Sequence, residues 1–244
     1  MKVVCIIQAR MSSSRLPGKV LKKICGRTVL EHDINRLKLA SNIDEIVIAT
    51  TINHEDDKIV EEAKRLKVKY FRGSENDVLS RYYFAAKENR ASIVIRVTSD
   101  CPCLDYVILD KMIELFIEKS NFDYMNNTIE RTYPRGYDIE IFYFYALEKA
   151  FHNAKKHYER EHVTPYLYDL HNNFKILSYK NIQDNSNYRV TLDTPEDFEV
   201  IKIIYEALFN KKRYFLLNDV VRFLDKHPEV VKINNYIEQK KLGE

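Results

Sequence analysis

The residues with the clearest chemical potential lie near the amino terminus, in residues 6–20. An apolar stretch runs there into a segment that carries Arg10, Arg15 and Lys19, together with three serines and a Pro-Gly pair that turns the chain. Guanidinium and ammonium groups bind phosphate oxygens, and free backbone amides at the end of a strand add further donors. The segment therefore predicts a binding site for a nucleotide triphosphate, and a basic surface loop is the alternative interpretation.

Two common phosphate-binding motifs are absent from this segment. Gly18-Lys19 has neither the upstream glycine nor the following Ser or Thr of a P-loop, and no G-x-G-x-x-G follows the first apolar stretch. A nucleotide bound here must be held by another arrangement of donors.

Two aspartates could complement the cationic segment. Asp100 follows an apolar run and precedes Pro102, and Asp193 stands between another apolar run and Thr194-Pro195. Carboxylates at such positions can hold Mg²⁺, which prefers oxygen ligands and keeps waters beside substrate phosphates. A side-chain turn before the proline and ordinary acidity at a helix start are the alternatives. Taken with the three cations, the aspartates predict a metal-assisted phosphoryl site.

The elements that must position these residues alternate along the first half of the chain. The predicted strands are Val3–Ile7, Glu45–Thr50, Val68–Phe71 and Ser92–Val97, and the predicted helices are Thr28–Leu39, His54–Leu66, Asp77–Lys87 and Tyr106–Glu118. This order favours an α/β fold with a mostly parallel central sheet and helices on both faces. Ligands of such sheets lie beyond the carboxyl ends of the strands, where the candidate residues stand.

The second half of the chain has a less regular pattern. The predicted strands are Phe122–Asn126, Asp138–Phe144, Phe174–Tyr179 and Tyr188–Leu192, and the predicted helices are Glu159–Leu170 and Pro195–Leu208, the latter capped by Thr194. The last stretch reads as a polar, Lys-rich helical tail with a solvated face. No linker is evident, so we expect a single domain over 1–244, with a nucleotide-binding half (1–120), an acceptor and dimerisation half (121–200) and a helical tail (201–244).

Composition narrows the class of protein. A net charge of +3 is too small to indicate a nucleic-acid binder, and no apolar run is long enough to cross a bilayer. Four cysteines in 244 residues do not form a disulfide framework, and a zinc pair at Cys101 and Cys103 would need partners that the sequence does not offer. We expect a cytoplasmic protein with reduced thiols and without a membrane partner.

Three segments carry a family resemblance. Residues 6–20 resemble the opening signature of the CMP-sugar synthetases, the acylneuraminate and Kdo cytidylyltransferases. Residues 71–83 and 159–166 resemble the SpsF-like branch, which is named for spore coat polysaccharide biosynthesis. The resemblance runs from Met1 to about Val200.

The resemblance implies a fold, a reaction and a set of site residues. It implies a Rossmann-like nucleotide-diphospho-sugar transferase fold and a Mg²⁺-dependent attack of an acceptor oxygen on the α-phosphorus of CTP, with release of pyrophosphate. Arg10, Arg15 and Lys19 would then hold the triphosphate, and Asp100 and Asp193 would bind the metal. The other implied nucleotide-binding residues are Ala9, Ser13, Thr50, Arg72, Gly73 and Ser74. Ser13 replaces the family's usual glycine, which could narrow the approach of the backbone to phosphate.

The acceptor is expected at charged residues of the second half. The candidate acceptor-binding residues are Arg131, Arg135, Asp138, Glu140 and His162. A solvated loop is the alternative for the first four, and packing within a helix is the alternative to a general-base role for His162.

The reaction and the assembly also have alternatives. A nucleotidyltransferase that uses another base such as GTP, or that acts on a sugar 1-phosphate, is a rival interpretation. A glycosyltransferase and a non-catalytic nucleotide-binding module are two others. The expected partners are CTP and a sugar-like acceptor, and the resemblance suggests a homodimer built through the second half.

Overall fold

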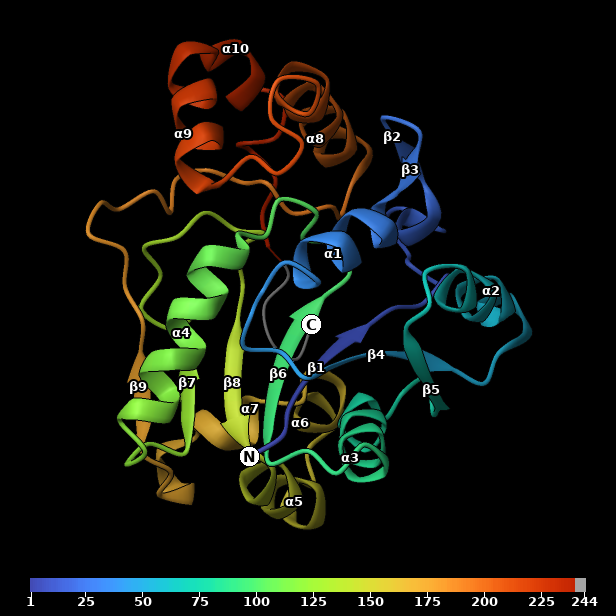
Figure 1. Cartoon of the computed structure of the whole chain (residues 1–244), viewed down its shortest axis with the longest axis vertical. Helices are drawn as coiled ribbons and strands as arrows, with labels where there is room; N and C mark the ends of the chain where they lie inside the picture. The colour runs from blue at the N-terminus through green and yellow to red at the C-terminus, as the bar shows by residue number, and fades with distance from the viewer. Residues whose placement is uncertain (240–244) are drawn as a thin grey trace.

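A seven-stranded sheet in the order β5-β4-β1-β6-β8-β7-β9 runs through the computed structural model, which describes residues 1–239 (Figure 1). Its strands are β1 (Val3–Gln8), β4 (Glu45–Thr51), β5 (Lys69–Gly73), β6 (Ile93–Thr98), β7 (Tyr124–Asn126), β8 (Glu140–Tyr143) and β9 (Ile176–Ser178). Strand β8 is antiparallel to β6 and β7, and the other neighbouring pairs are parallel. The predicted α/β class and mostly parallel sheet are confirmed.

The helices that connect these strands follow in chain order. They are α1 (Val29–Leu37), α2 (Asp57–Arg65), α3 (Val78–Glu88), α4 (Tyr106–Glu118), α5 (Phe144–Asn153), α6 (His157–His162), α7 (Pro165–Tyr168), α8 (Pro195–Leu208), α9 (Leu217–Lys226) and α10 (Pro228–Val231). Short 3₁₀ turns form at η1 (Lys19–Leu21), η2 (His54–Asp56) and η3 (Leu170–Asn172), and β2 (Lys23–Ile24) pairs with β3 (Arg27–Thr28) in a small hairpin. Helix α5 and the hairpin were not expected from the sequence.

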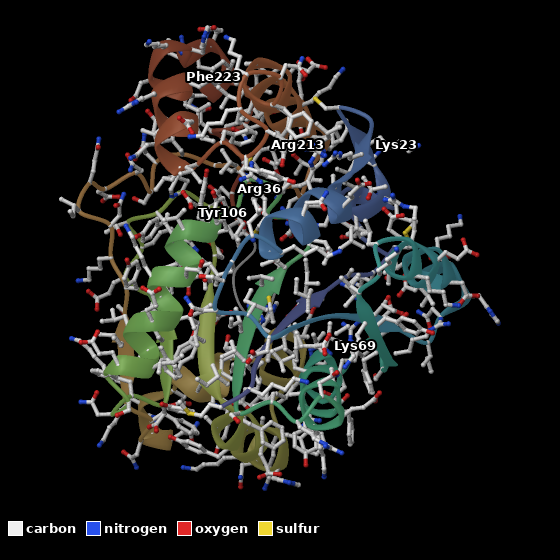
Figure 2. The ribbon with its side chains drawn as sticks, viewed as in Figure 1. Lys23, Arg36, Lys69, Tyr106, Arg213 and Phe223 are labelled. Atoms are coloured by element: carbon white, nitrogen blue, oxygen red, sulfur yellow. The ribbon has the colours of Figure 1, made fainter. Side chains whose placement is uncertain are left out.

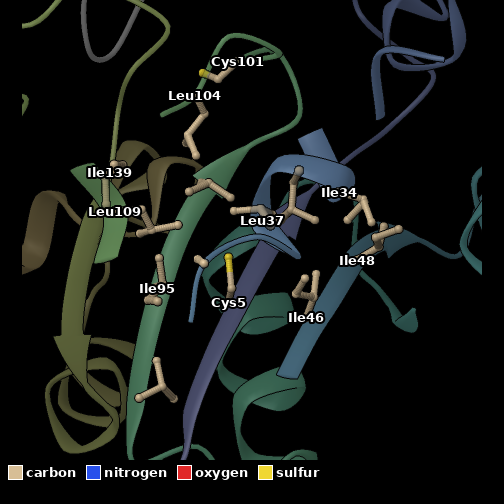
Figure 3. Packing of buried hydrophobic residues seen from close by; sticks show 14 of the residues in the cluster. Cys5, Ile34, Leu37, Ile46, Ile48, Ile95, Cys101, Leu104, Leu109 and Ile139 are labelled. Carbon is tan, nitrogen blue, oxygen red and sulfur yellow. The ribbon is translucent and has the colours of Figure 1, made fainter. Parts of the chain in front are cut away.

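The first strand shows why both faces of the sheet are covered. Cys5 packs with Ile34 of α1 and Leu109 of α4 on one face, as Figure 3 shows. Val4 and Ile6 point to the opposite face and pack among residues of α3 and α5. Successive side chains of a strand alternate between faces, so a continuous apolar run is needed where helices cover both.

The carboxyl-terminal helices form a third apolar cluster instead of a solvated tail. Ile201 and Ile204 of α8 pack with Val220 and Leu224 of α9, and all four side chains are buried. Over the part that the structure describes, the predicted helical character of 201–244 is confirmed, and its description as a solvated tail is wrong. The apolar residues of α9 recur at helical spacing and give it an apolar face, although its overall composition is polar.

A buried arginine ties this cluster to the first helix. Arg36 of α1 is 2% exposed, and Figure 2 shows it between α1 and the carboxyl-terminal helices. Its Nη1 donates to the carbonyl oxygens of Phe215, at 2.8 Å, and Leu104, at 3.2 Å, and its guanidinium lies 4.3 Å from the Phe215 ring centroid. These partners offset part of the cost of burying the charge, although Nη2 has no hydrogen-bond partner in the described chain.

Two predicted elements of the second half differ from the structure. The segment 188–192 pairs through a single bridge, between Arg135 and Arg189, and does not form a strand. Gly136 makes this approach possible, since its φ is +103° and an added Cβ would lie 2.4 Å from the carbonyl oxygen of Val190. The predicted helix 159–170 is broken at Val163, whose φ is +72°, into α6 and α7.

Two expectations from the sequence concern a membrane-spanning helix and a zinc site. No helix within residues 1–239 combines the length and the apolar character that a membrane crossing requires. Cys101 and Cys103 are free thiols, and no group of three or more His, Cys, Asp or Glu side chains gathers in the described residues. The described residues therefore supply no further ligands for a zinc site at Cys101 and Cys103.

Candidate active site

A pocket of about 430 Å³ lies at the carboxyl ends of β1 and β6. Its walls come from the segment after β1, from α3, from the end of β6 and from α6, and Asp193 and Gln239 complete them. The volume is within the range of pockets that hold a small-molecule ligand. Its place is the one predicted for a ligand of a parallel sheet.

Lys19 lies between the two predicted metal ligands. Its Nζ is 2.8 Å from Asp100 Oδ2 and 2.8 Å from Asp193 Oδ1, and it also donates to the carbonyl oxygen of Leu192 at 2.7 Å. The two aspartates, which are 93 positions apart, thus share one ammonium group. The structure brings together the three residues on which the sequence argument depended most.

The charges of this cluster hold one another ionised. Burial alone would lower the pKa of Lys19, but the carboxylates of Asp100 and Asp193 outweigh burial and raise it above its ordinary value. Burial likewise would raise the pKa of Asp100, but Lys19 and a hydrogen bond from Thr98 lower it. The ammonium and the Asp100 carboxylate therefore remain charged at neutral pH.

The segment after β1 is folded by backbone hydrogen bonds. The carbonyl oxygen of Met11 accepts from the amides of Ser13 and Gly18, each at 2.9 Å, and Gly18 has φ of +67°. Ser13 has no positive φ, and its Oγ accepts weakly from the amide of Leu16 at 3.4 Å. The serine that replaces the family's glycine therefore causes no backbone strain here.

The other two cations of this segment also contact carboxylates. Arg15 Nη2 lies 3.0 Å from Asp193 Oδ2, and Arg10 Nη1 lies 3.5 Å from Glu75 Oε1. Both line the pocket, as do Ala9 and Ser13. The segment therefore lines the pocket, and its binding of a triphosphate stays a prediction.

Asp193 is positioned by the start of α8. Asp197 is fully buried, and its carboxylate accepts from the backbone amide of Asp193 at 3.0 Å and from both Nε and Nη2 of Arg189 at 2.8 Å. Thr194 caps α8 by accepting from the amide of Asp197. Asp197 is thus a structural anchor for Asp193.

The short helix α6 supplies the opposite wall. Glu161 and His162 line the pocket at the end of α6, where Val163 turns the chain. Burial lowers the pKa of His162, so its imidazole is neutral at pH 7. Among the five predicted acceptor-binding residues, His162 is the one that lines this pocket.

The other four candidate acceptor residues form ion pairs or backbone contacts outside the pocket. Arg131 donates to both oxygens of Asp138, at 2.6 and 3.0 Å, and Glu140 is buried against Arg96 and the hydroxyl of Tyr124. Arg135 pairs through its backbone with the segment 188–190. These four residues do not line the pocket, so its geometry does not support their predicted role in binding the acceptor.

Four predicted nucleotide-binding residues also lie outside the pocket lining. Thr50 is fully buried, and Ser74 Oγ accepts from the amide of Asp77 at 3.2 Å. Arg72 holds the turn after β4, since it donates to the carbonyl oxygen of Thr51 at 2.8 Å and pairs with Asp57 at 2.6 Å. Gly73 ends β5 beside the side chain of Arg81.

The sequence argument missed several residues of the pocket. Arg81 and Glu161 line it, yet each belongs to a segment that we identified by resemblance without assigning these residues a role. The two segments also meet, because Arg160 donates to Asp77 Oδ1 at 3.1 Å. Gln239 accepts from Arg189 Nη1 at 3.0 Å and reaches the pocket from the far end of the chain, which no local pattern could indicate.

The donor set fits a hard divalent cation. Asp100 and Asp193 offer carboxylate oxygens on either side of one positive charge, the ammonium of Lys19, which marks a position where a cation is stable. Two protein carboxylates are typical for Mg²⁺, which takes its remaining ligands from water and phosphate. The residues present are therefore suitable for a magnesium-dependent site.

Comparison with known proteins agrees with this geometry. The family model described as cytidylyltransferase matches residues 4–226. An uncharacterised protein of Methanocaldococcus jannaschii is 41% identical over 100% of this chain and 99% of its own length, and the spore coat polysaccharide biosynthesis protein SpsF of Bacillus subtilis is 30% identical over 93% and 95%. The solved structure of a cytidylyltransferase from Leptospira borgpetersenii is 39% identical, has a TM-score of 0.92, and covers 98% of this chain and 100% of its own. The chain belongs to the cytidylyltransferase family of nucleotidyltransferase enzymes.

Proposed function

We propose that this pocket binds CTP with Mg²⁺ and transfers CMP to a sugar or sugar-acid acceptor, with release of pyrophosphate. The observation that carries the proposal is the cluster of Lys19, Asp100 and Asp193 in a pocket of about 430 Å³. Cations and metal-binding carboxylates within one cluster suit a triphosphate, whose negative charge must be neutralised in binding and in the transition state.

The residues divide between holding the nucleotide and holding the metal. Arg10, Arg15 and Lys19 supply positive charge along one wall, and the carboxylates of Asp100 and Asp193 would hold Mg²⁺. When bound, the ion would supply charge neutralisation for the triphosphate. Thr98 keeps Asp100 oriented, since its hydroxyl donates to Asp100 Oδ1 at 2.5 Å.

We place the acceptor beside α6. Glu161 and His162 line the pocket there, and the neutral imidazole of His162 can accept a proton from an attacking hydroxyl group. A bond forms between the acceptor oxygen and the α-phosphorus, and the bond from that phosphorus to the bridging oxygen of the β-phosphate breaks. The protein's contribution is mainly positioning and charge stabilisation.

Similarity to SpsF supports a role in surface polysaccharide synthesis, in which the CMP-linked product is the precursor. The homodimer expected from the family resemblance belongs to the same proposal. The proposed reaction within one pocket requires neither the polysaccharide role nor the homodimer.

The experiment measures pyrophosphate release by the purified protein with each of the four nucleoside triphosphates, Mg²⁺ and a panel of sugar-acid acceptors. We expect turnover with CTP, and its loss when EDTA is added. Asp100→Asn should lower kcat about 100-fold or more, because a charged group that contacts metal and phosphate is removed.

Asp33→Asn is the matched control. Asp33 of α1 is buried, burial raises the pKa of its carboxyl group well above the usual value, and asparagine has nearly the same shape. Its replacement should leave kcat within about twofold. Turnover with another nucleoside triphosphate and not with CTP would show that the base is not cytosine. Full activity of Asp100→Asn would contradict the role of Asp100 in binding the metal.

A further inference from the structure

A third arginine lines the pocket besides Arg10 and Arg15, and unlike them it pairs with no carboxylate in the described chain. Arg81 of α3 is 2% exposed and lines the pocket. Its Nε and Nη1 are buried without a hydrogen-bond partner in the described chain. Arg15 and Lys19, by contrast, each lie within 3.0 Å of a carboxylate oxygen.

Other buried arginines of the protein show how unusual this is. Arg36 donates to two carbonyl oxygens and Arg96 pairs with Glu140, so each leaves one buried nitrogen without a partner, whereas Arg81 leaves two and has no carboxylate. Burial lowers the pKa of Arg81, and the more distant charges of Asp56 and Glu75 offset only part of that effect. A desolvated cation without a partner is costly in the free protein and indicates that a ligand supplies the missing charge.

The neighbouring strand is shaped around this side chain. Gly73 ends β5, and an added Cβ would lie 2.8 Å from Arg81 Cγ and 3.1 Å from the Phe71 ring. The backbone of Gly73 is not in the left-handed region, so the turn itself does not require glycine. The glycine instead leaves the room through which the Arg81 side chain reaches the pocket.

We propose that Arg81 is a further substrate-binding residue, whose guanidinium binds an oxyanion group that enters the pocket beside α3. The inference rests on the proposed function for the identity of the substrates. A phosphate of the nucleotide and an acidic group of the acceptor share the required chemistry. Bonds from Nη2 and neutralisation of the buried charge together would make this contact strong.

Arg81→Met removes the charge and keeps an unbranched apolar side chain of similar reach. Calorimetric titration with CTP and Mg²⁺, with inorganic pyrophosphate and with cytidine separates phosphate binding from base binding. If the nucleotide supplies the oxyanion, affinity for CTP and pyrophosphate falls about 10- to 100-fold, the factor expected for a charge-assisted hydrogen bond, and affinity for cytidine is unchanged. If the acceptor supplies it, the KM for the acceptor rises by that factor and CTP binding is unchanged.

The melting temperature of the ligand-free protein distinguishes this role from a structural one. Arg81→Met should melt at the same or a higher temperature, because an uncompensated buried charge is removed. Arg36→Met is the matched control and should melt at a lower temperature, because it loses two carbonyl partners. Gly73→Ala should weaken binding by a smaller factor by displacing Arg81.

Three results would overturn the inference. One is wild-type affinity of Arg81→Met for CTP and pyrophosphate with an unchanged KM for the acceptor. The second is a fall in melting temperature like that of Arg36→Met. The third is an equal loss of affinity for cytidine. Failure of the wild-type protein to bind any nucleotide would instead reject the proposed function, and the pyrophosphate titration would still test Arg81.

Discussion

Two loops of this protein carry arginines beside a Pro-Gly or Pro-Arg-Gly turn, and they use them differently. In residues 9–19, after β1, Lys19 and Arg15 contact carboxylates from segments far along the chain. In residues 127–139, before β8, Arg131 pairs with Asp138, seven positions away in the same loop. The first loop lines the pocket, and the second does not.

The difference lies in where the partner comes from. Asp100 is 81 positions from Lys19 and Asp193 is 174 positions away, so that cluster exists only once the sheet has formed. A pair closed within one loop stiffens that loop and leaves less charge for a ligand. In this protein, the loop whose cations meet carboxylates from other segments lines the pocket, and the loop whose arginine pairs within itself does not.

The largest expected effect comes from removing the centre of the first cluster. Lys19→Met should lower kcat/KM about 100- to 1,000-fold, because it removes charge that would stabilise the triphosphate. Burial then raises the pKa of Asp100 without Lys19 to oppose it, so the acid limb of the pH–rate profile should move to higher pH. Lys23→Met, at an exposed lysine of β2, is the control and should match the wild type. An unshifted acid limb with near-normal activity would show that the cluster is not part of the site.

A smaller effect is expected in the second loop. Arg131→Met leaves Asp138 without its bidentate partner and should lower the free energy of unfolding by about 1–3 kcal/mol, measured by urea denaturation. The KM for CTP should stay within about twofold, because Arg131 does not line the pocket. A tenfold rise in that KM would place both loops in one site and remove the contrast between them.

Much of the fold was predictable because local pattern and tertiary structure agree in the first half. Helices α4 and α8 match their predicted bounds, and the four parallel strands β1, β4, β5 and β6 lie within two residues of theirs. The segment 188–192 has a strand-like composition, but it forms only a bridge at Gly136. Its apolar residues are explained by burial in the third cluster, since Val190 and Leu192 pack there.

The candidate site was predictable where charge and strand ends coincide, as at Lys19, Asp100 and Asp193. It was not predictable for Arg81, which stands within a helix among aromatic residues and reads as part of a packed face. Glu140 is the opposite case. The sequence predicted that it binds the acceptor, but its carboxylate is the buried partner of Arg96. The presence of a distant partner decides the case of Glu140 and its absence decides that of Arg81, and spacing in the sequence reveals neither.

The proposed reaction requires a metal-assisted nucleotide site at Asp100 and Asp193. The most direct test is a crystal structure of the wild-type protein with CTP and Mn²⁺, whose anomalous scattering locates the ion. We expect an anomalous peak within coordination distance of both carboxylates, with phosphate oxygens of CTP on the ion and beside Lys19. A nucleotide bound elsewhere, or an ion that contacts neither aspartate, would contradict it.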